Sequence, residues 1–150
     1  MEITFGKHKG KSTELVFFES PDYVNWILSK SQAKGQMAMV YNDILRLIKK
    51  FDSANFTVNC HTEQCNKIAT YCTIHRRNSN MINWWCDDCE PYQLKSTPGM
   101  LEVIRNFGDA LNYVNNNSGN NDLTSLIQQL ARAKGLPEDI DENEAQAFFI

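Results

Sequence analysis

The sequence has no long apolar run. A membrane-spanning helix needs about 18 consecutive apolar residues, and the chain has no such stretch. Its first residues, MEITFGKHKGK, also lack the apolar centre of a secretion signal. We therefore expect a cytoplasmic protein that has no membrane partner.

Common enzyme signatures are missing as well. The chain contains no Walker loop, no dinucleotide-binding fingerprint and no HExxH zinc motif. Ser12 or Cys72 with His8 or His75 would be a nucleophile and a base, but no local signature supports such a pair. We predict that the protein has no catalytic residues and is not an enzyme.

Charge of one sign does not dominate. The chain has 15 Lys and Arg against 18 Asp and Glu, a net charge of −3. Residues 1–50 hold eight basic and five acidic side chains, whereas residues 101–150 hold three and eight. A nucleic-acid-binding surface is therefore expected in the N-terminal part rather than at the C-terminal end.

Four of the five cysteines form two close pairs, Cys60-x4-Cys65 and Cys86-x2-Cys89. In a cytosolic protein such pairs favour metal binding over disulfides. Thiolates bind zinc strongly, and two pairs joined by a β-hairpin can close a tetrahedral site that leaves no position for water or substrate. The spacing therefore predicts one structural zinc ion held by Cys60, Cys65, Cys86 and Cys89.

Three further residues of metal-binding type lie nearby: Cys72, His75 and His61. A second zinc site would need four more ligands. Cys72 and His75 should also fall on opposite faces of a strand, because strand side chains alternate. We predict a core position for Cys72 and a surface or hydrogen-bonding position for His75. The sequence leaves open whether any of the three touches the metal.

Residues 5–11, FGKHKGK, form a second candidate site, which we term the lysine–glycine loop. Its two glycines allow tight turns and close approach of the backbone to a ligand. Ammonium groups and backbone N–H donors of such a loop can hold phosphate; the candidate residues are Lys7, His8, Lys9 and Lys11. A solvated turn whose lysines face water is an equally good interpretation of these residues.

Arg76 and Arg77 are expected at the tip of the hairpin, just before the turn-forming residues 78–80. Arginine clamps phosphate, and the faces of Trp84 and Trp85 on the returning strand could stack on bases. Adjacent strand residues face opposite sides, however. We expect both tryptophans to pack in the core, and Arg76 and Arg77 to contact nucleic acid.

Periodicity and cap signals predict an α+β protein in three parts. These are a small N-terminal α/β module (1–55), a central zinc-ribbon β-hairpin (56–93) and C-terminal helices that pack on both (94–150). The first part should hold a short strand near Ile3, a helix from Pro21 to Gly35, and a second helix to Phe51.

The C-terminal part should begin with a helix over 98–114, followed by a polar loop at 115–121. A further helix should end near Gly135, and Asp141 should cap a last short helix. The apolar end, residues 148–150, is expected to dock either on this chain's core or on a partner.

The stretch ITFGKHKGKSTELVFFESPDYVNWIL contains Phe-Gly-Lys-His-Lys-Gly, an apolar segment and then a Tyr-x-x-Trp helix. About residues 2–34 thereby resemble the small C-terminal domain of exodeoxyribonuclease X-like proteins. With the segment CxxxxC…WWCxxCxPYQ added, the chain is similar to uncharacterised bacterial and phage-associated proteins that join this domain to a four-cysteine zinc ribbon.

In the named family this domain accompanies a DnaQ-like exonuclease, so the resemblance implies a nucleic-acid context. Such exonucleases hold two Mg²⁺ ions on a cluster of acidic residues. The domain that supplies this cluster is absent from the sequence, and the acidic residues near the C-terminus are interpreted as solvated helix-start residues. Nuclease activity is therefore not carried over.

We expect a zinc-containing nucleic-acid-binding accessory protein, specifically a DNA-binding one, without catalytic activity of its own. The alternative is a protein-interaction or assembly subunit, in phage defence or replication, that docks a protein partner or another copy of itself through its C-terminal helices. A metal-dependent hydrolase is a third interpretation, which the four-ligand site disfavours because catalytic zinc keeps a position open for water.

Overall fold

The computed structural model describes residues 1–94, 98–117 and 122–150. Within these ranges the chain forms six α-helices, one short 3-10 helix and a three-stranded antiparallel sheet, so the α+β prediction is confirmed. In chain order the elements are α1 (Thr13–Glu19), α2 (Pro21–Leu28), α3 (Gln36–Ser53), β1 (Tyr71–His75), β2 (Asn78–Trp85), the 3-10 helix (Pro91–Leu94), β3 (Leu101–Ile104), α4 (Phe107–Asn116), α5 (Leu123–Ala133) and α6 (Glu142–Phe148).

The first three helices follow from cap chemistry and apolar spacing. Ser12 caps α1 by accepting the Leu15 N–H at 3.0 Å, and Pro21 opens α2. Gly35 does not end α2, which stops at Leu28; it precedes α3 with a φ of 65°, a left-handed value that glycine adopts without strain. The face of α3 that is buried carries Val40, Ile44, Leu47 and Phe51.

Strand β1 is the centre of the sheet, between β2 and β3. Tyr71 pairs with Trp85 at one end of the β1–β2 hairpin, and His75 pairs with Asn78 at the other, where Arg76 and Arg77 form the turn. Residues 71–74 of β1 are all buried, because a central strand is covered on both faces. One end of the hairpin thus lies at the cysteine segments, and the other end carries two arginines.

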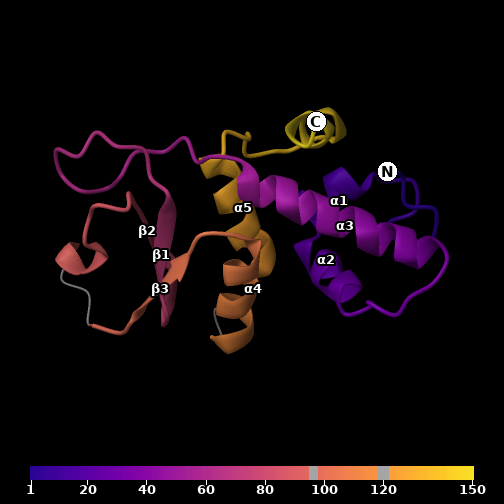
Figure 1. Ribbon diagram of the computed structural model, residues 1–150, viewed down its shortest axis with the longest axis horizontal. Helices are drawn as coiled ribbons and strands as arrows, with labels where there is room; N and C mark the ends of the chain where they lie inside the picture. The colour runs from indigo at the N-terminus through magenta and orange to yellow at the C-terminus, as the bar shows by residue number, and fades with distance from the viewer. Residues whose placement is uncertain (95–97, 118–121) are drawn as a thin grey trace.

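One hydrophobic core extends through the described chain. It joins Phe17 of α1, Ile74 of β1, Ile104 of β3 and Leu130 of α5, and helix α6 packs against α1. Figure 1 shows the sheet at one end of the long axis, helices α1 to α3 toward the other, and α4 and α5 between them. The sheet and the N-terminal helices are therefore packed against a shared hydrophobic core.

The apolar C-terminal end docks on this chain's own core. Phe149 is 3% exposed and stacks on Phe18 at 5.3 Å between ring centres, and its ring also meets Phe17 edge-on. Lys50 Nζ donates to the Phe149 carbonyl at 2.7 Å. Only Ile150, at 98% exposure, extends from the core. The expected docking is thus satisfied within the chain.

The helix predicted over 98–114 is wrong in its first half. Leu101–Ile104 forms β3, and α4 begins at Phe107, where the Asn106 side chain accepts the Asp109 N–H at 2.8 Å. The spacing of Leu101 and Ile104 suits a helix, whereas Leu101 and Val103 alternate as in a strand, so the local pattern fits both. The open edge of β1 offers β3 ladder hydrogen bonds, and this tertiary pairing overrides the local pattern.

Smaller differences occur elsewhere. Near Ile3 the chain makes only an isolated bridge between Glu2 and Ser12, and residues 15–18 belong to α1. Of the predicted polar loop at 115–121, residues 118–121 lie outside the described part of the chain. The last helix begins as predicted, with a capping box in which Asp141 accepts the Glu144 N–H and the Glu144 side chain accepts the Asp141 N–H.

Candidate metal centre and basic surfaces

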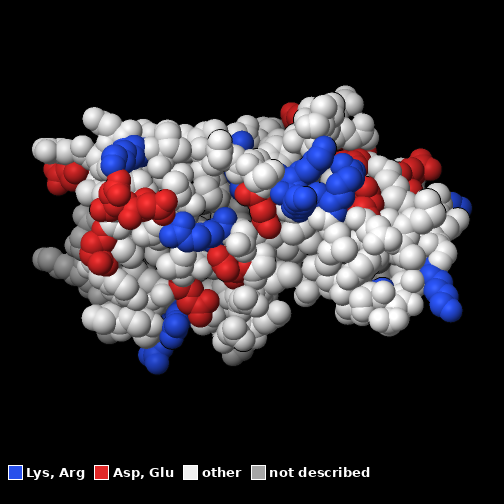
Figure 2. All heavy atoms as spheres, viewed as in Figure 1, with Lys and Arg blue, Asp and Glu red and all other residues white. Residues whose placement is uncertain are grey.

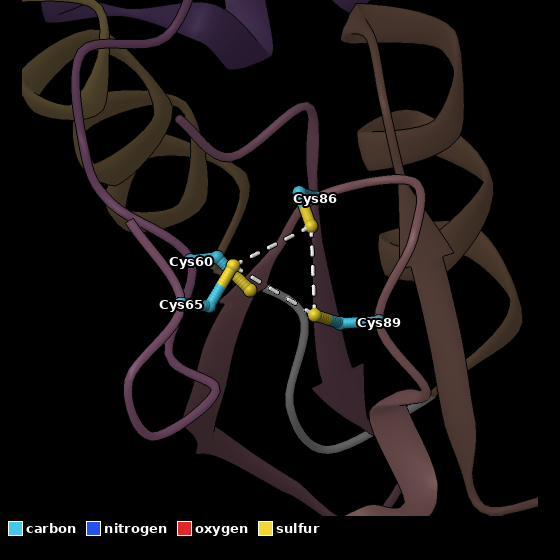
Figure 3. A group of neighbouring side chains, drawn as sticks. All are labelled: Cys60, Cys65, Cys86 and Cys89. Atoms are coloured by element: carbon cyan, nitrogen blue, oxygen red, sulfur yellow. Dashed lines mark hydrogen bonds between the residues drawn. The ribbon is translucent and has the colours of Figure 1, made fainter. Parts of the chain in front are cut away.

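The four paired cysteines meet at one point. Their sulfur atoms all lie within 4.8 Å of one another and point toward a common centre (Figure 3). The Sγ atoms of Cys65, Cys86 and Cys89 are separated by 3.9, 3.5 and 3.9 Å. Sulfurs bound about 2.3 Å from a tetrahedral ion would be about 3.8 Å apart. The cluster can therefore hold a metal ion.

Local backbone turns aim these sulfurs. In the first pair the Cys65 N–H donates to the Thr62 carbonyl at 3.0 Å, and Gln64 takes a φ of 65°, which is unusual for a residue with a side chain. In the second pair the Cys89 N–H donates to the Cys86 carbonyl at 3.4 Å. Each pair thus forms a tight loop that places two sulfurs on its inner side.

Because the thiols lie close together, their pKa values differ from one cysteine to another. Burial raises the pKa of Cys60, but hydrogen bonds with Thr62, Cys86 and Cys89 together lower that pKa to about 6. The hydrogen bond with Thr62 lowers the pKa of Cys89, whereas those with the other three sulfurs raise it to about 12. Sulfurs this close share protons unless a cation replaces them, so metal binding must release protons.

A small second core surrounds the sulfur cluster. Cys60 and Cys86 pack with Tyr71 and Trp85, and Trp85 is fully buried with its Nε1–H donating to Thr73 Oγ1 at 2.8 Å. Among the described residues this core consists of these four side chains, with Cys65 and Cys89 packed against them, and it is separate from the main core. A metal ion at the sulfurs would therefore fix the segments that the main core does not reach.

Asp87 and Asp88, inside the second cysteine loop, both bind neighbouring segments of the chain. Asp87 accepts from Thr70 Oγ1 at 2.9 Å and from Arg105 at 3.1 Å, and these bonds lower its pKa. Asp88 forms an ion pair with Lys67 of the first cysteine segment. The two aspartates thus link neighbouring segments around the metal centre.

The other residues of metal-binding type lie outside the cluster. Cys72 is fully buried in the main core, and burial raises its pKa to about 12. His61 Nδ1 accepts the Trp84 N–H at 3.2 Å, and His75 Nδ1 accepts the Arg77 N–H at 3.1 Å. The predictions of a core cysteine and a hydrogen-bonding histidine are confirmed, and the metal-binding group found among the described residues has four members.

The tryptophans also pack as predicted. Trp85 is fully buried beside the metal centre, and the half-buried Trp84 packs on the main core with its ring centre 4.9 Å from that of Phe56.

The lysine–glycine loop is a compact double turn. Gly6 and Gly10 have φ values of 72° and 91°, and hydrogen bonds from Ile3 N–H to Lys11 and from Gly10 N–H to Ile3, both 2.8 Å, close its base. Lys7 and Lys9 are exposed. Lys11, by contrast, is ion-paired with Glu19. Two of the predicted lysines therefore have exposed side chains for an anion.

His8 differs from the lysines beside it. It is 4% exposed, neither ring nitrogen has a hydrogen-bond partner, and its ring meets the Tyr23 ring edge-on at 4.6 Å. Burial lowers the pKa of His8, as do Lys7 and Lys11, and Glu19 opposes this. His8 is therefore a neutral, buried group rather than a surface cation.

The two arginines at the hairpin tip are both exposed but are not equivalent. Arg76 forms an ion pair with Glu102 of β3 at 3.4 Å, whereas no ion pair among the described residues involves Arg77. The tip and the lysine–glycine loop also lie on different halves of the long axis (Figure 1). A ligand must therefore span the molecule to touch both.

Basic side chains also gather on α3, whose residues were not among the predicted nucleic-acid contacts. Figure 2 shows Lys and Arg grouped over the region of α3, with Asp and Glu beside them. Arg46, Lys49 and Lys50 of this helix are exposed, although Arg46 pairs with Asp43 at 2.9 Å. Their helical spacing in the sequence could have indicated a basic surface on this helix. Charged residues at such spacing more often form only a solvated face.

Comparison with known proteins yields no relative: no family model, no curated protein and no solved structure matches this chain. Among the helices described, none is both long enough and apolar enough for a membrane span.

Proposed function

We propose that the sulfur cluster holds one zinc ion with a structural role. An all-sulfur, tetrahedral ligand set suits Zn²⁺, and four protein ligands leave no position for a reacting water. Cys60 and Cys86 are nearly buried, and the cluster has its own small apolar shell of Tyr71 and Trp85. The ion would fasten the base of the β1–β2 hairpin and leave its tip free to bind.

We further propose that the protein binds nucleic acid, specifically DNA, as an accessory protein without catalytic activity. The observation that carries this is the hairpin itself: the four-cysteine cluster at one end and the exposed pair Arg76 and Arg77 at the other. Arginine holds phosphate through a planar fork of donors. The exposed Lys7 and Lys9 add a second contact for the same backbone. The resemblance of residues 2–34 to the exodeoxyribonuclease X-like domain supports the same context.

Equilibrium binding across a salt series tests this proposal. Fluorescence anisotropy with labelled single-stranded DNA, duplex DNA and RNA of one length should give affinities that fall linearly on a log–log plot against salt. A substitution that removes one phosphate-binding side chain should lower the slope by about one. We expect Arg77→Glu to lower the slope by more than Arg76→Glu does, because Glu102 already pairs Arg76.

Arg132→Glu is the matched control. It makes the same charge change at an exposed residue of α5, in the acidic C-terminal part of the chain. Equal losses from Arg77→Glu and Arg132→Glu would mean that net charge, not the hairpin tip, governs binding. Preference for RNA over DNA of the same length would overturn the DNA assignment alone.

Docking of a protein partner through the C-terminal end has less support. That alternative needs an available apolar surface at residues 148–150, but Phe149 is packed between Phe17 and Phe18 of this chain. A monomer by light scattering, with nucleic-acid binding unaffected by removal of Ile150, is the outcome that the proposal expects.

A further inference from the structure

A surface cavity lies where the lysine–glycine loop meets α2 and α3. Its volume is about 550 Å³, within the range of sites that take small molecules. His8, Tyr23, Trp26 and Met37 line it, together with the acids Glu19 and Asp22. The cavity is thus formed by the same loop that carries Lys7 and Lys9, and it faces the solvent beside them.

One polar side chain that lines this cavity, His8, is unsatisfied. Both of its nitrogens are buried without a hydrogen-bond partner, and the residue is 4% exposed. An unpaired buried polar atom costs about 1–3 kcal/mol, so such groups normally have a partner. A neutral imidazole has one donor and one acceptor nitrogen. A fitting ligand would offer an acceptor and a donor of its own in return.

The apolar wall favours a flat ring. Tyr23 and Trp26 stand one helical turn apart on α2, with ring centres 5.7 Å apart and planes inclined by 36°. Trp26 is 45% exposed, which is high for so large an apolar side chain. Bases stack on such rings whatever their identity. The wall and the imidazole together match a planar heterocycle with polar edges.

The charges around the cavity orient this ligand. Asp22 disfavours an anion inside it, and Glu19 does so less because it is ion-paired with Lys11. Lys7 lines the cavity, and Lys30 Nζ lies 5.0 Å from the centre of the Trp26 ring. A nucleotide would therefore place its base inside and leave its phosphates to the lysines outside.

We propose that the cavity accepts one unstacked base of a bound strand, with the ring against Trp26 and the polar edge on His8. The inference rests on the nucleic-acid binding proposed above and makes it more specific: the strand must be single or locally opened. Duplex DNA, whose bases are stacked and paired, would bind only through its phosphates.

The test compares two single strands with the same backbone, an oligothymidylate and an equally long oligomer of stable abasic sites. The unaltered protein should bind the oligothymidylate about tenfold more tightly, given the usual contribution of one stacked base, and the emission of Trp26 should be quenched. His8→Phe keeps the ring shape but removes both nitrogens. His8→Phe and Trp26→Ala should each abolish the preference for the oligothymidylate over the abasic strand. Both variants should still bind the abasic strand.

Leu45→Ala is the control, because Leu45 on α3 is 43% exposed and does not line the cavity. It should keep the preference. If both strands bind equally to the unaltered protein, the base site is refuted while nucleic-acid binding survives. If neither strand binds, both proposals fail together. Quenching of Trp26 by tetramethylammonium but not by thymidine would also refute the base site, because the aromatic wall would then recognise a cation.

Discussion

Replacing Cys89 by serine removes one sulfur from a half-buried position and changes little else in the packing. The expected effect follows from the free energies that order the chain around Cys89. Ordering residues 59–70, roughly 12 residues before β1 that lie outside the main core, costs about 1 kcal/mol each or more in backbone entropy. Burial of Tyr71 and Trp85 contributes about 4–6 kcal/mol per ring. Those two rings alone do not order the segment, whereas a structural zinc ion contributes about 10–16 kcal/mol.

We therefore expect Cys89→Ser, or removal of the metal by a chelator, to release residues 59–70, whereas Phe56 and Val58 stay packed on the folded main core. Hydrogen exchange measures this directly. The amides of Cys60, His61 and Thr70 donate to Lys67, Trp84 and Trp85, at 2.8–2.9 Å. These amides should lose protection, and the amides of α3 should keep it. The emission of the fully buried Trp85 should shift to longer wavelength.

Cys72→Ala provides the control, because it removes a cysteine that lies in the main core. It should lower the overall stability but keep one zinc per chain and full protection of the same amides. Unchanged protection of residues 59–70 in metal-free protein would refute the reasoning, since the cluster would then be a result of folding and not its cause. A stoichiometry near two zinc ions, or near zero, would refute the single-site assignment.

Three further outcomes are expected. In the folded, metal-free protein Cys72 should resist alkylation after the other four cysteines have reacted, because it is fully buried in the main core, which stays folded without the metal; equal labelling by mass spectrometry would contradict this. His8→Phe should raise the free energy of unfolding by about 1–3 kcal/mol. Because the folded-state pKa of His8 is lowered, the unfolded chain gains a proton that the folded chain does not as pH falls below about 6.5; stability measured by urea unfolding should therefore decline below that pH, and less so in His8→Phe. Lys134→Met should cost about 1–3 kcal/mol, because Lys134 Nζ donates to the carbonyls of Phe51 and Ala54, both at 2.7 Å, and their loss would be seen as a lower urea midpoint.

Lys134 shows how far local sequence can mislead. It follows α5 in a stretch that ends a helix, where a lysine is expected to face water. In the folded chain it is 8% exposed and closes the end of α3, with its Nζ 4.7 and 4.5 Å from the ring centres of Phe51 and Phe56. Burial lowers its pKa to about 8, although Asp52 opposes this. The partners lie about 80 residues earlier in the chain, so no window of sequence contains them.

The sequence by itself determined the features that depend on near neighbours. The grouping of the four cysteines was predictable because two short loops and one hairpin bring Cys60, Cys65, Cys86 and Cys89 together by local geometry. The last helix was predictable for the same reason, since its capping box lies within four residues. The core position of Cys72 was also predicted, from its place inside an expected strand.

Only the tertiary structure decided what depends on distant contacts. Strand β3 exists because β1 has a free edge, and no local pattern distinguishes it from a helix. His8 looked like a surface cation among lysines, and it became a buried, unpaired group because α2 covers the lysine–glycine loop with Tyr23. The separation of that loop from the arginine tip is likewise set by the helices packed between them (Figure 1). Burial and distance are properties of the whole fold, and the chemistry of these residues follows from them.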